Sequence, residues 1–357
     1  MSQKLHALLN TAIILSEQFQ TTLDTTPPTT SEDAPTITTT EGPADPTKSL
    51  RAQVTKLSLL AITSPFTPSA ISTCLVSVND SVMPSMVTAA LLLTPGEYTK
   101  AFSTEARILV KTGLKEFAAL VREITDVANK FDTNNEEKKE LSKSEKDVIT
   151  SQTGRVWDVC DSISTLVVNG VVGHVAKRVQ EWHDLVKDAI DELEEWDPED
   201  EDGGFEELMG SDDDDESTTK IGEDEDGDQD EGMEALRNQK KSLLRALKPI
   251  SQIYPAIITH RLKKGGLTTS DKTQIGKLET LTSNLQSVPD HVDEAAGSLY
   301  EHNLDDCIRF LGLAKVTADK AIELVVTPWS TSEEDKFTVW SKTWRKVMGD
   351  VISDVRP

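Results

Sequence analysis

The side chains best suited to chemistry in this sequence are its histidines, cysteines and carboxylates, and their spacing limits what they can do. No two of the six histidines have the HExxH or HxxxH spacing of a metal site: His6, His174, His183, His260, His291 and His302. The three cysteines, Cys74, Cys160 and Cys307, lie far apart and form no CxxC pattern. A sparse, odd number of cysteines is typical of buried free thiols in a reducing compartment. We therefore expect neither a metal nor a cofactor.

The carboxylates are numerous but concentrated in one segment. Residues 191–231 contain 23 Asp and Glu against one Lys, a local charge of −22, whereas the rest of the chain carries 39 acidic against 36 basic residues. Catalytic carboxylates need partly buried surroundings that shift their pKa values, and a solvated run of like charges does not supply them. The sequence also lacks the GxGxxG, P-loop and GxSxG motifs. These observations favour an interaction protein, without a small-molecule substrate, over an enzyme.

A basic cluster follows the acidic segment directly. Residues 237–264 contain eight Lys or Arg and no acid, and they include Lys240, Lys241 and Arg245. Two interpretations are open: a solvated helix face, or a docking site for the acidic segment of the same chain, which raised salt would weaken. A patch for nucleic acid is disfavoured, because the adjacent negative charge would repel phosphate. We expect no direct nucleic-acid binding.

Tryptophan and serine provide the remaining candidates. Because Trp is enriched at binding hot spots, we select Trp182, Trp196 and Trp329 as candidate partner-binding residues, together with the three basic residues named above. Trp196 stands at the edge of the acidic segment and Trp329 directly follows a proline. Ser211 has Asp at positions +1 to +4, which is typical of a substrate of an acid-directed kinase; an unmodified surface serine is the alternative.

The elements that must position these residues are helices. Apolar residues recur at spacings of three and four along most of the chain, and no segment shows the sustained alternation of a strand. The stripes from Val172 to Trp196 and from Leu278 to Leu299 are heptads, as in one helix of an antiparallel bundle or, alternatively, a coiled-coil face. Pro249 and Pro255 should kink or break the helix that carries the basic cluster. We expect helices at about 2–23, 49–61, 68–93, 98–131, 149–167, 172–196, 236–257, 278–299, 308–325 and 337–351.

Two segments are predicted to be disordered. Residues 24–47 are rich in Thr and Pro and nearly free of apolar side chains, and the acidic residues 198–231 should stay extended and solvated. The predicted architecture is all-α: an N-terminal helical bundle at 1–197, an acidic disordered linker at 198–231 and a C-terminal helical bundle at 232–357. The most apolar window, 82–93, is shorter than the roughly 18 residues of a membrane span. We expect neither a membrane span nor a targeting segment.

Two stretches of the sequence resemble a known family. Residues 154–161 read GRVWDVCD, and residues 182–196 read WHDLVKDAIDELEEW and are followed by acidic residues. These stretches, the helix-rich first half, the acidic interruption and the second helical region resemble the cyclin-D-binding proteins, also described as Id-like helix-loop-helix proteins. The resemblance covers about Leu50 to Val326. It implies a pair of helical bundles of the vinculin and α-catenin type.

The resemblance also implies a function. Members of that family are adaptors that bind cyclin D-type proteins and helix-loop-helix transcription factors, restrain the cell cycle or transcription, and occur in nucleus and cytoplasm. We expect such an adaptor here, in which a groove between amphipathic helices accepts a partner helix. Two alternatives remain: an acidic chaperone for histones or other basic proteins, and a vinculin-like cytoskeletal linker.

Overall fold

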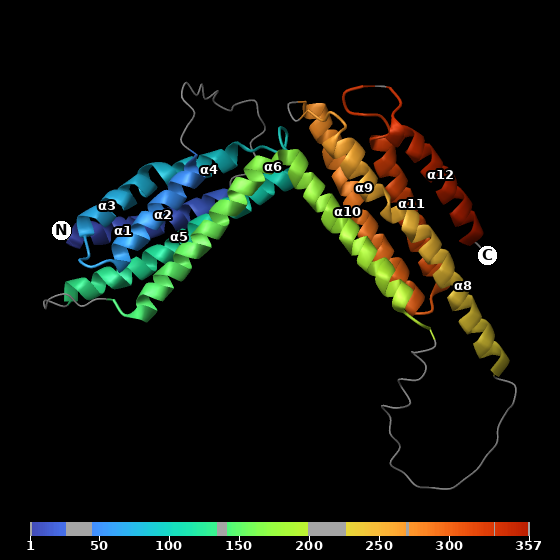
Figure 1. Cartoon of the computed structure of the whole chain (residues 1–357), viewed down its shortest axis with the longest axis horizontal. Coiled ribbons are helices and arrows are strands. Elements are labelled where there is room, and N and C mark those ends of the chain that lie inside the picture. Colours follow the sequence, from blue (N-terminus) through green and yellow to red (C-terminus); the bar gives the residue numbers. More distant parts are fainter. Residues whose placement is uncertain are drawn as a thin grey trace, which may run out of the picture. The chain divides into compact units, whose positions relative to one another are not determined.

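All regular secondary structure in the described part of the chain is helical, and it contains no strand (Figure 1). The computed structural model describes residues 2–25, 45–133, 141–198, 226–268, 271–331 and 333–355. The chain folds into two compact units, Met1–His174 (unit 1) and Val175–Pro357 (unit 2). The prediction of an all-α protein built from helical bundles is confirmed.

Unit 1 is a bundle whose core is lined by the predicted apolar stripes. On the second helix the apolar residues Leu50, Val54 and Leu57 are buried. On the first helix the buried face runs through Leu5 and Leu9, while the adjacent Leu8 is only half-buried. The helices are α1 (Ser2–Thr25), α2 (Pro46–Ile62), α3 (Pro68–Ser77), the π-helix η1 (Val78–Val82), α4 (Met83–Leu92), α5 (Lys100–Thr133) and the first half of α6 (Lys143–Glu195).

Unit 2 contains the second half of α6 and the helices that follow it. The heptad stripe of α10 is buried from Leu278 to Leu299, and Pro289 lies within this helix without ending it. Polar caps begin several of the helices: Asp271 accepts from the Thr273 amide at 2.8 Å, and Asn303 accepts from the Asp306 amide at 3.2 Å. The helices are α8 (Asp226–Ser251), α9 (Ile253–Ile257), the π-helix η2 (Ile258–Lys263), α10 (Lys272–Tyr300), α11 (Leu304–Leu324) and α12 (Lys336–Val355).

The predicted effect of the two prolines in the basic stretch is confirmed. Pro249 lies inside α8, which ends two residues later at Ser251, and Pro255 lies in the short helix α9, which passes into η2. A proline has no amide hydrogen to donate and clashes with the carbonyl four residues earlier, so a regular helix cannot continue through both positions. Arg261 lies in η2, directly after these prolines, and is 0% exposed.

The boundary between the units differs from the predicted one. It falls at His174/Val175 rather than at residue 197, because Gly170 (φ 60°, ψ −170°) interrupts α6. The heptad stripe beyond this interruption, including Val179, Val186 and Leu193, is buried in unit 2. Val167, just before the interruption, is 70% exposed. The heptad pattern predicted a bundle helix correctly but could not show to which bundle it belongs.

The acidic segment therefore connects two helices of the same unit. It begins after Pro198, at the end of α6, and ends at α8, and both α8 and the second half of α6 belong to unit 2. The helix α8 begins at Asp226, inside the predicted linker 198–231, and residues 199–225 lie outside the described residues. The predicted insert 24–47 is also shorter, because α1 reaches Thr25 and Asp45 caps α2 by accepting from the Thr47 amide at 3.0 Å. Residues 26–44 lie outside the described residues.

Two helical stretches are long and apolar enough, by length and composition alone, to cross a membrane: Pro68–Leu92 and Lys143–Glu195. The first is longer than the window 82–93 considered in the sequence, because α3, η1 and α4 follow one another directly. Its apolar residues, including Ile71, Leu75 and Met86, lie in the core of unit 1. The absence of a membrane span stays a prediction.

Candidate protein-interaction surfaces

Trp182 is part of the core of unit 2. Its side chain is 6% exposed, and the guanidinium of Arg178 lies 5.6 Å from the centre of its ring. Trp182 belongs to the same heptad stripe as the buried Val179 and Val186. A side chain packed in this way is not available to a partner, so its candidate role as a binding anchor does not fit the structure.

Trp196 and Lys240 meet at the C-terminal end of α6. The half-buried Trp196 ring contacts Tyr300 of α10 edge-on, with ring centres 4.9 Å apart. The ammonium of Lys240 donates to the carbonyls of Glu194 (3.1 Å) and Trp196. Helix C-termini leave carbonyls without amide partners and carry partial negative charge, so a lysine there is favourable. Lys240 therefore stabilises the end of α6, and its predicted partner-binding role is untested.

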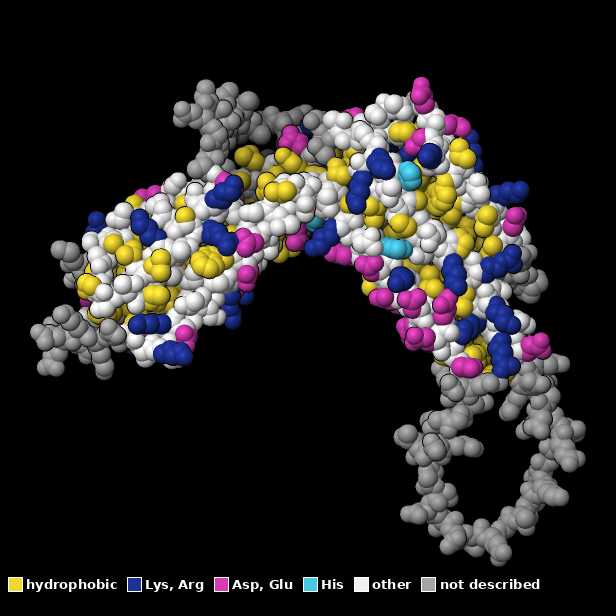
Figure 2. Space-filling view, in the orientation of Figure 1, with side chains coloured by type: hydrophobic (Ala, Val, Ile, Leu, Met, Phe, Trp, Pro, Cys, Tyr) yellow, Lys and Arg dark blue, Asp and Glu magenta, His cyan; other side chains and the backbone are white. Residues whose placement is uncertain are grey.

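Lys241 and Arg245 lie on the exposed face of α8, and Figure 2 shows Lys and Arg side chains gathered over this helix. The neighbouring Lys248 is paired with Glu194 of α6 at 2.6 Å. The basic cluster is thus divided between residues that hold α6 and residues on the outer surface. Docking of the acidic segment onto this face, and phosphorylation of Ser211, concern residues 199–225, which lie outside the described part of the chain.

Trp329 joins the segment after α11 to η2 and the loop that follows η2. Its indole nitrogen donates to the Arg261 carbonyl at 2.9 Å, and its backbone amide donates to the Gly265 carbonyl at 3.0 Å. The ammonium of Lys277 lies 5.6 Å from the centre of the half-buried ring. Added at Gly265, a Cβ atom would lie 2.8 Å from the Trp329 ring, so glycine permits this close approach. These contacts give Trp329 a structural role and leave its partner-binding role a prediction.

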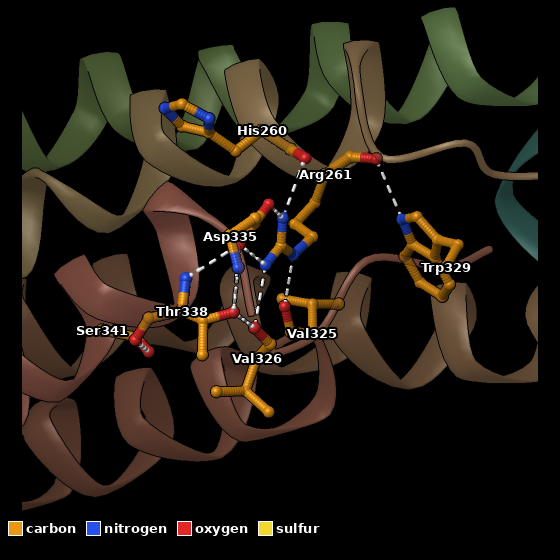
Figure 3. Close-up of polar contacts among 8 residues, drawn as sticks. All are labelled: His260, Arg261, Val325, Val326, Trp329, Asp335, Thr338 and Ser341. Atoms are coloured by element: carbon orange, nitrogen blue, oxygen red, sulfur yellow. Dashed lines mark hydrogen bonds and ion pairs between the residues drawn. The ribbon is translucent and has the colours of Figure 1, made fainter. Parts of the chain in front are cut away.

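Arg261, one of the eight basic residues between 237 and 264, is the polar centre of unit 2. All five of its N–H groups donate to acceptors (Figure 3). Two go to Asp335, at 2.7 and 2.9 Å, and the others go to the carbonyls of His260, Val325 and Val326. The guanidinium also lies 4.2 Å from the centre of the Phe337 ring. A single buried cation therefore ties η2 to the segment that joins α11 to α12.

Asp335 accepts two hydrogen bonds from Arg261 and also caps the start of α12. It accepts from the amide of Thr338 at 2.9 Å, while the Thr338 hydroxyl donates to the Val326 carbonyl at 2.7 Å. The hydrogen bonds from Arg261 hold the pKa of Asp335 well below its usual range, although partial burial raises it. The hydrogen bonds from Thr338 lower the pKa further. A pattern of Asp followed three residues later by Thr, before an apolar helix, predicts the cap but not the arginine.

The cysteines and histidines show no arrangement for catalysis. All three cysteines are buried, and desolvation raises the pKa of the Cys160 thiol to about 11. A buried thiol of that kind is mostly protonated near neutrality and is a poor nucleophile. Among the described residues, no group of three or more His, Cys, Asp or Glu side chains is placed to hold a metal ion. Burial also lowers the pKa of His183, whose ring lies 5.8 Å from Tyr254.

The apolar side chains that remain exposed lie outside the predicted heptad stripes. Most residues of those stripes are buried in the cores, and Ala189 and Trp196 of the first stripe remain half-buried, so most of each stripe does not line a partner groove. Val168 is 83% exposed, next to the exposed Val167 in unit 1, and Leu185 is 56% exposed in unit 2. Other exposed apolar side chains, such as Leu59 and Ile108 in unit 1, lie on separate helices. Isolated exposed apolar residues are common, and adjacent ones are more informative.

Comparison with known families identifies one segment of the chain. Residues 45–199 match the family described as "Grap2 and cyclin-D-interacting, N-terminal". The match covers α2 to α6 and includes both stretches, 154–161 and 182–196, on which the resemblance was based. It confirms the resemblance to the cyclin-D-binding proteins. No curated protein is matched by the chain.

Proposed function

We propose that this chain, whose residues 45–199 match the family described as "Grap2 and cyclin-D-interacting, N-terminal", is a non-enzymatic adaptor that binds a D-type cyclin. The observation that carries the proposal is the family match, which spans all the helices of unit 1 except α1 and extends along α6 into unit 2. A role in the cell cycle or transcription, helix-loop-helix factors as further partners, and residence in nucleus and cytoplasm follow from the same family as part of the proposal.

The structure supports a binding role with two features of the matched segment. The neighbouring Val167 and Val168 are the most exposed large apolar side chains among the described residues, and both lie inside 45–199. The buried thiol of Cys160 in the same segment has a raised pKa, which suits packing better than nucleophilic chemistry. We propose the two valines as part of the cyclin contact, because apolar contacts exposed together mark interaction sites.

The test is a direct binding measurement between the purified full chain and a D-type cyclin, at low and high salt. We expect binding that persists at high salt, because an apolar contact is not screened by ions. Replacement of Val167 and Val168 by Ser should weaken it about tenfold or more, since each valine contributes up to about 1.5 kcal/mol when fully buried. The control variant Leu313→Ser changes an exposed leucine of α11 outside the matched segment. No binding by the unmodified chain would refute the proposal.

A chaperone for basic proteins is the second candidate, and the acidic residues 191–231 favour it. Because α8 begins at Asp226, the test should change Asp to Asn and Glu to Gln only within residues 199–225. Loss of histone binding on this change, together with unchanged cyclin binding, would assign the two activities to different parts of the chain. The cytoskeletal alternative predicts that the chain sediments with actin filaments, and failure to do so above background would dismiss it.

A further inference from the structure

The C-terminal halves of α6 and α10 present a partly exposed apolar strip. The strip is located by the Trp196–Tyr300 ring contact, which brings the ends of these two helices together. Seven residues are nearly two full helical turns, so Ala189 and Leu185, seven and eleven residues before Trp196, lie on the same face of α6. Gly297, three residues before Tyr300, lies on the matching face of α10. We call these residues the α6–α10 seam: Leu185, Ala189, Trp196, Gly297 and Tyr300.

The seam is open to a partner. Leu185 is 56% exposed, and the other four residues are half-buried. A Cβ atom built on Gly297 would meet nothing within 4 Å, so no side chain covers the α10 side at this position. The seam therefore combines an exposed leucine, half-buried aromatic rings and an open glycine along one line.

Acidic side chains border the seam on both helices. Glu192 lies four residues before Trp196 and Asp293 seven residues before Tyr300, so each shares the face of the aromatic residue. Asp188 lies beside them, and all three are exposed and form no ion pair among the described residues. Figure 2 shows Asp and Glu side chains gathered along the lower part of α6. The border of the seam thus carries uncompensated negative charge.

The other side of α6 provides an internal contrast. Glu194 lies two residues from Glu192 and hence on the opposite side of the helix, where Lys248 of α8 pairs with it at 2.6 Å. Lys240 of α8 is likewise held by the carbonyls at the end of α6. Lys240 and Lys248 of α8 therefore bind the side of α6 that faces α8, whereas among the described residues no ion pair is formed by Asp188, Glu192 or Asp293 on the seam side.

We propose that the α6–α10 seam is a docking surface for a basic amphipathic helix of a partner protein. An apolar stripe of such a helix would cover Leu185 and the Trp196 and Tyr300 rings, and its flanking Lys or Arg residues would pair with Asp188, Glu192 and Asp293. Charge complementarity selects this occupant, because an acidic or neutral helix would leave three carboxylates beside a low-dielectric contact. The acidic residues that follow α6 would speed the encounter. The proposal goes beyond cyclin binding and does not depend on it.

The test uses a synthetic helical peptide of about 18 residues, with leucines on one face and lysines on both sides of that face. Its binding to the full chain is followed by fluorescence anisotropy at low and high salt. We expect binding that weakens with salt, a loss of about tenfold for Leu185→Ala, and a larger loss with a flatter salt dependence for Glu192→Lys combined with Asp293→Lys. All three positions are exposed, so the variants should fold, which circular dichroism checks.

Matched controls separate the seam from general attraction between opposite charges. Leu313→Ala and Asp350→Lys alter an exposed leucine and an exposed aspartate on α11 and α12, and they should leave peptide binding unchanged. A peptide with Glu in place of Lys should bind the Glu192→Lys/Asp293→Lys variant better than the unmodified chain.

A full-length variant, with the carboxylates of residues 199–225 changed to amides, distinguishes binding at the seam from attraction by the acidic segment. If the peptide still binds this variant and Leu185→Ala still weakens it, the seam is the site. If binding disappears with the carboxylates of 199–225 and ignores Leu185, the acidic segment alone attracts the peptide and the proposal is overturned. Equal binding of a scrambled peptide without an apolar face would overturn it as well.

Discussion

The ion pairs of unit 1 and the Arg261–Asp335 pair of unit 2 differ in how far they are exposed to solvent. In unit 1 the ion pairs join helices at the surface, for example Lys111–Asp24 at 2.6 Å and Arg122–Glu17 at 2.7 Å, with side chains about half exposed. In unit 2 the guanidinium of Arg261 is fully buried and all of its donors are used. Solvent screens the first kind of pair, whereas the second kind is costly to break because it leaves buried groups without partners. The comparison predicts that polar substitutions will matter far more in unit 2.

The largest effect should come from Arg261→Met. The substitution leaves Asp335 and the carbonyls of Val325 and Val326 without their donors, and loss of one partner of a buried pair costs about 3–5 kcal/mol. Amide hydrogen exchange of the full chain measures this, because it reports stability separately for each region. Protection should fall in α12 and η2 and stay unchanged in α1 and α5. An equal fall in both units would break the comparison.

Asp335→Asn should have the next largest effect on the free energy of unfolding, and this effect should depend on pH. At neutral pH we expect a loss of about 1.5–3 kcal/mol, the range for a hydrogen bond to a charged group. The folded-state pKa of Asp335 is depressed, so its stabilisation is present above the unfolded pKa, about 4, and is lost as the pH falls through the folded value. Urea unfolding from pH 6 to pH 2 should show a shallower decline for the variant. Parallel curves would contradict the assignment.

Gly170→Ala tests the interruption in α6 that ends unit 1. The backbone there (φ 60°, ψ −170°) lies in a region that is essentially restricted to glycine, so the substitution should cost about 1–3 kcal/mol. Gly154→Ala provides the control, because a Cβ atom there meets nothing within 4 Å and its φ is ordinary. Greater stability of Gly170→Ala in thermal unfolding would show that α6 runs straight through residue 170 in solution.

Trp329→Phe and Trp157→Phe form a matched pair across the units. Each removes one indole N–H donor: the bond to the Arg261 carbonyl at 2.9 Å in unit 2, and the bond to the Thr55 hydroxyl at 3.2 Å in unit 1. We expect a loss of about 0.5–1.5 kcal/mol for Trp329→Phe and less for Trp157→Phe, since the Arg261 carbonyl belongs to the buried network. Midpoints of urea unfolding give both values, and the reverse order would weaken the contrast.

The smallest effect should come from Arg122→Gln in unit 1. The pair with Glu17 is half exposed, so its loss should cost about 0–1 kcal/mol at low salt and still less at high salt. Thermal unfolding at the two salt concentrations measures it. A cost as large as that of Arg261→Met would mean that exposure is a poor guide to the worth of a pair in this protein.

The candidate site residues show where sequence reasoning stops. Trp182, Trp196 and Trp329 were selected by type and position. In the structure Trp182 lies in the core, Trp196 packs against Tyr300 at the end of α6, and Trp329 hydrogen-bonds the Arg261 carbonyl. Arg261 was grouped with Lys241 and Arg245 because all three belong to one basic stretch of sequence. In the structure Arg261 lies in η2 and is buried, and nothing in the local pattern predicts that its acceptors come from residues 325–335.

The sequence by itself determined that the protein is helical, which faces of most helices are apolar, and that residues 45–199 match the cyclin-D-interacting family, because periodicity and family pattern are local properties of the chain. Only the tertiary structure decided that α6 is divided at Gly170, that the second half of α6 packs in the same unit as α8, that Arg261 is buried, and that Leu185 is left exposed. These outcomes depend on which helices pack together, and packing partners far apart in the sequence leave no periodic trace in either segment.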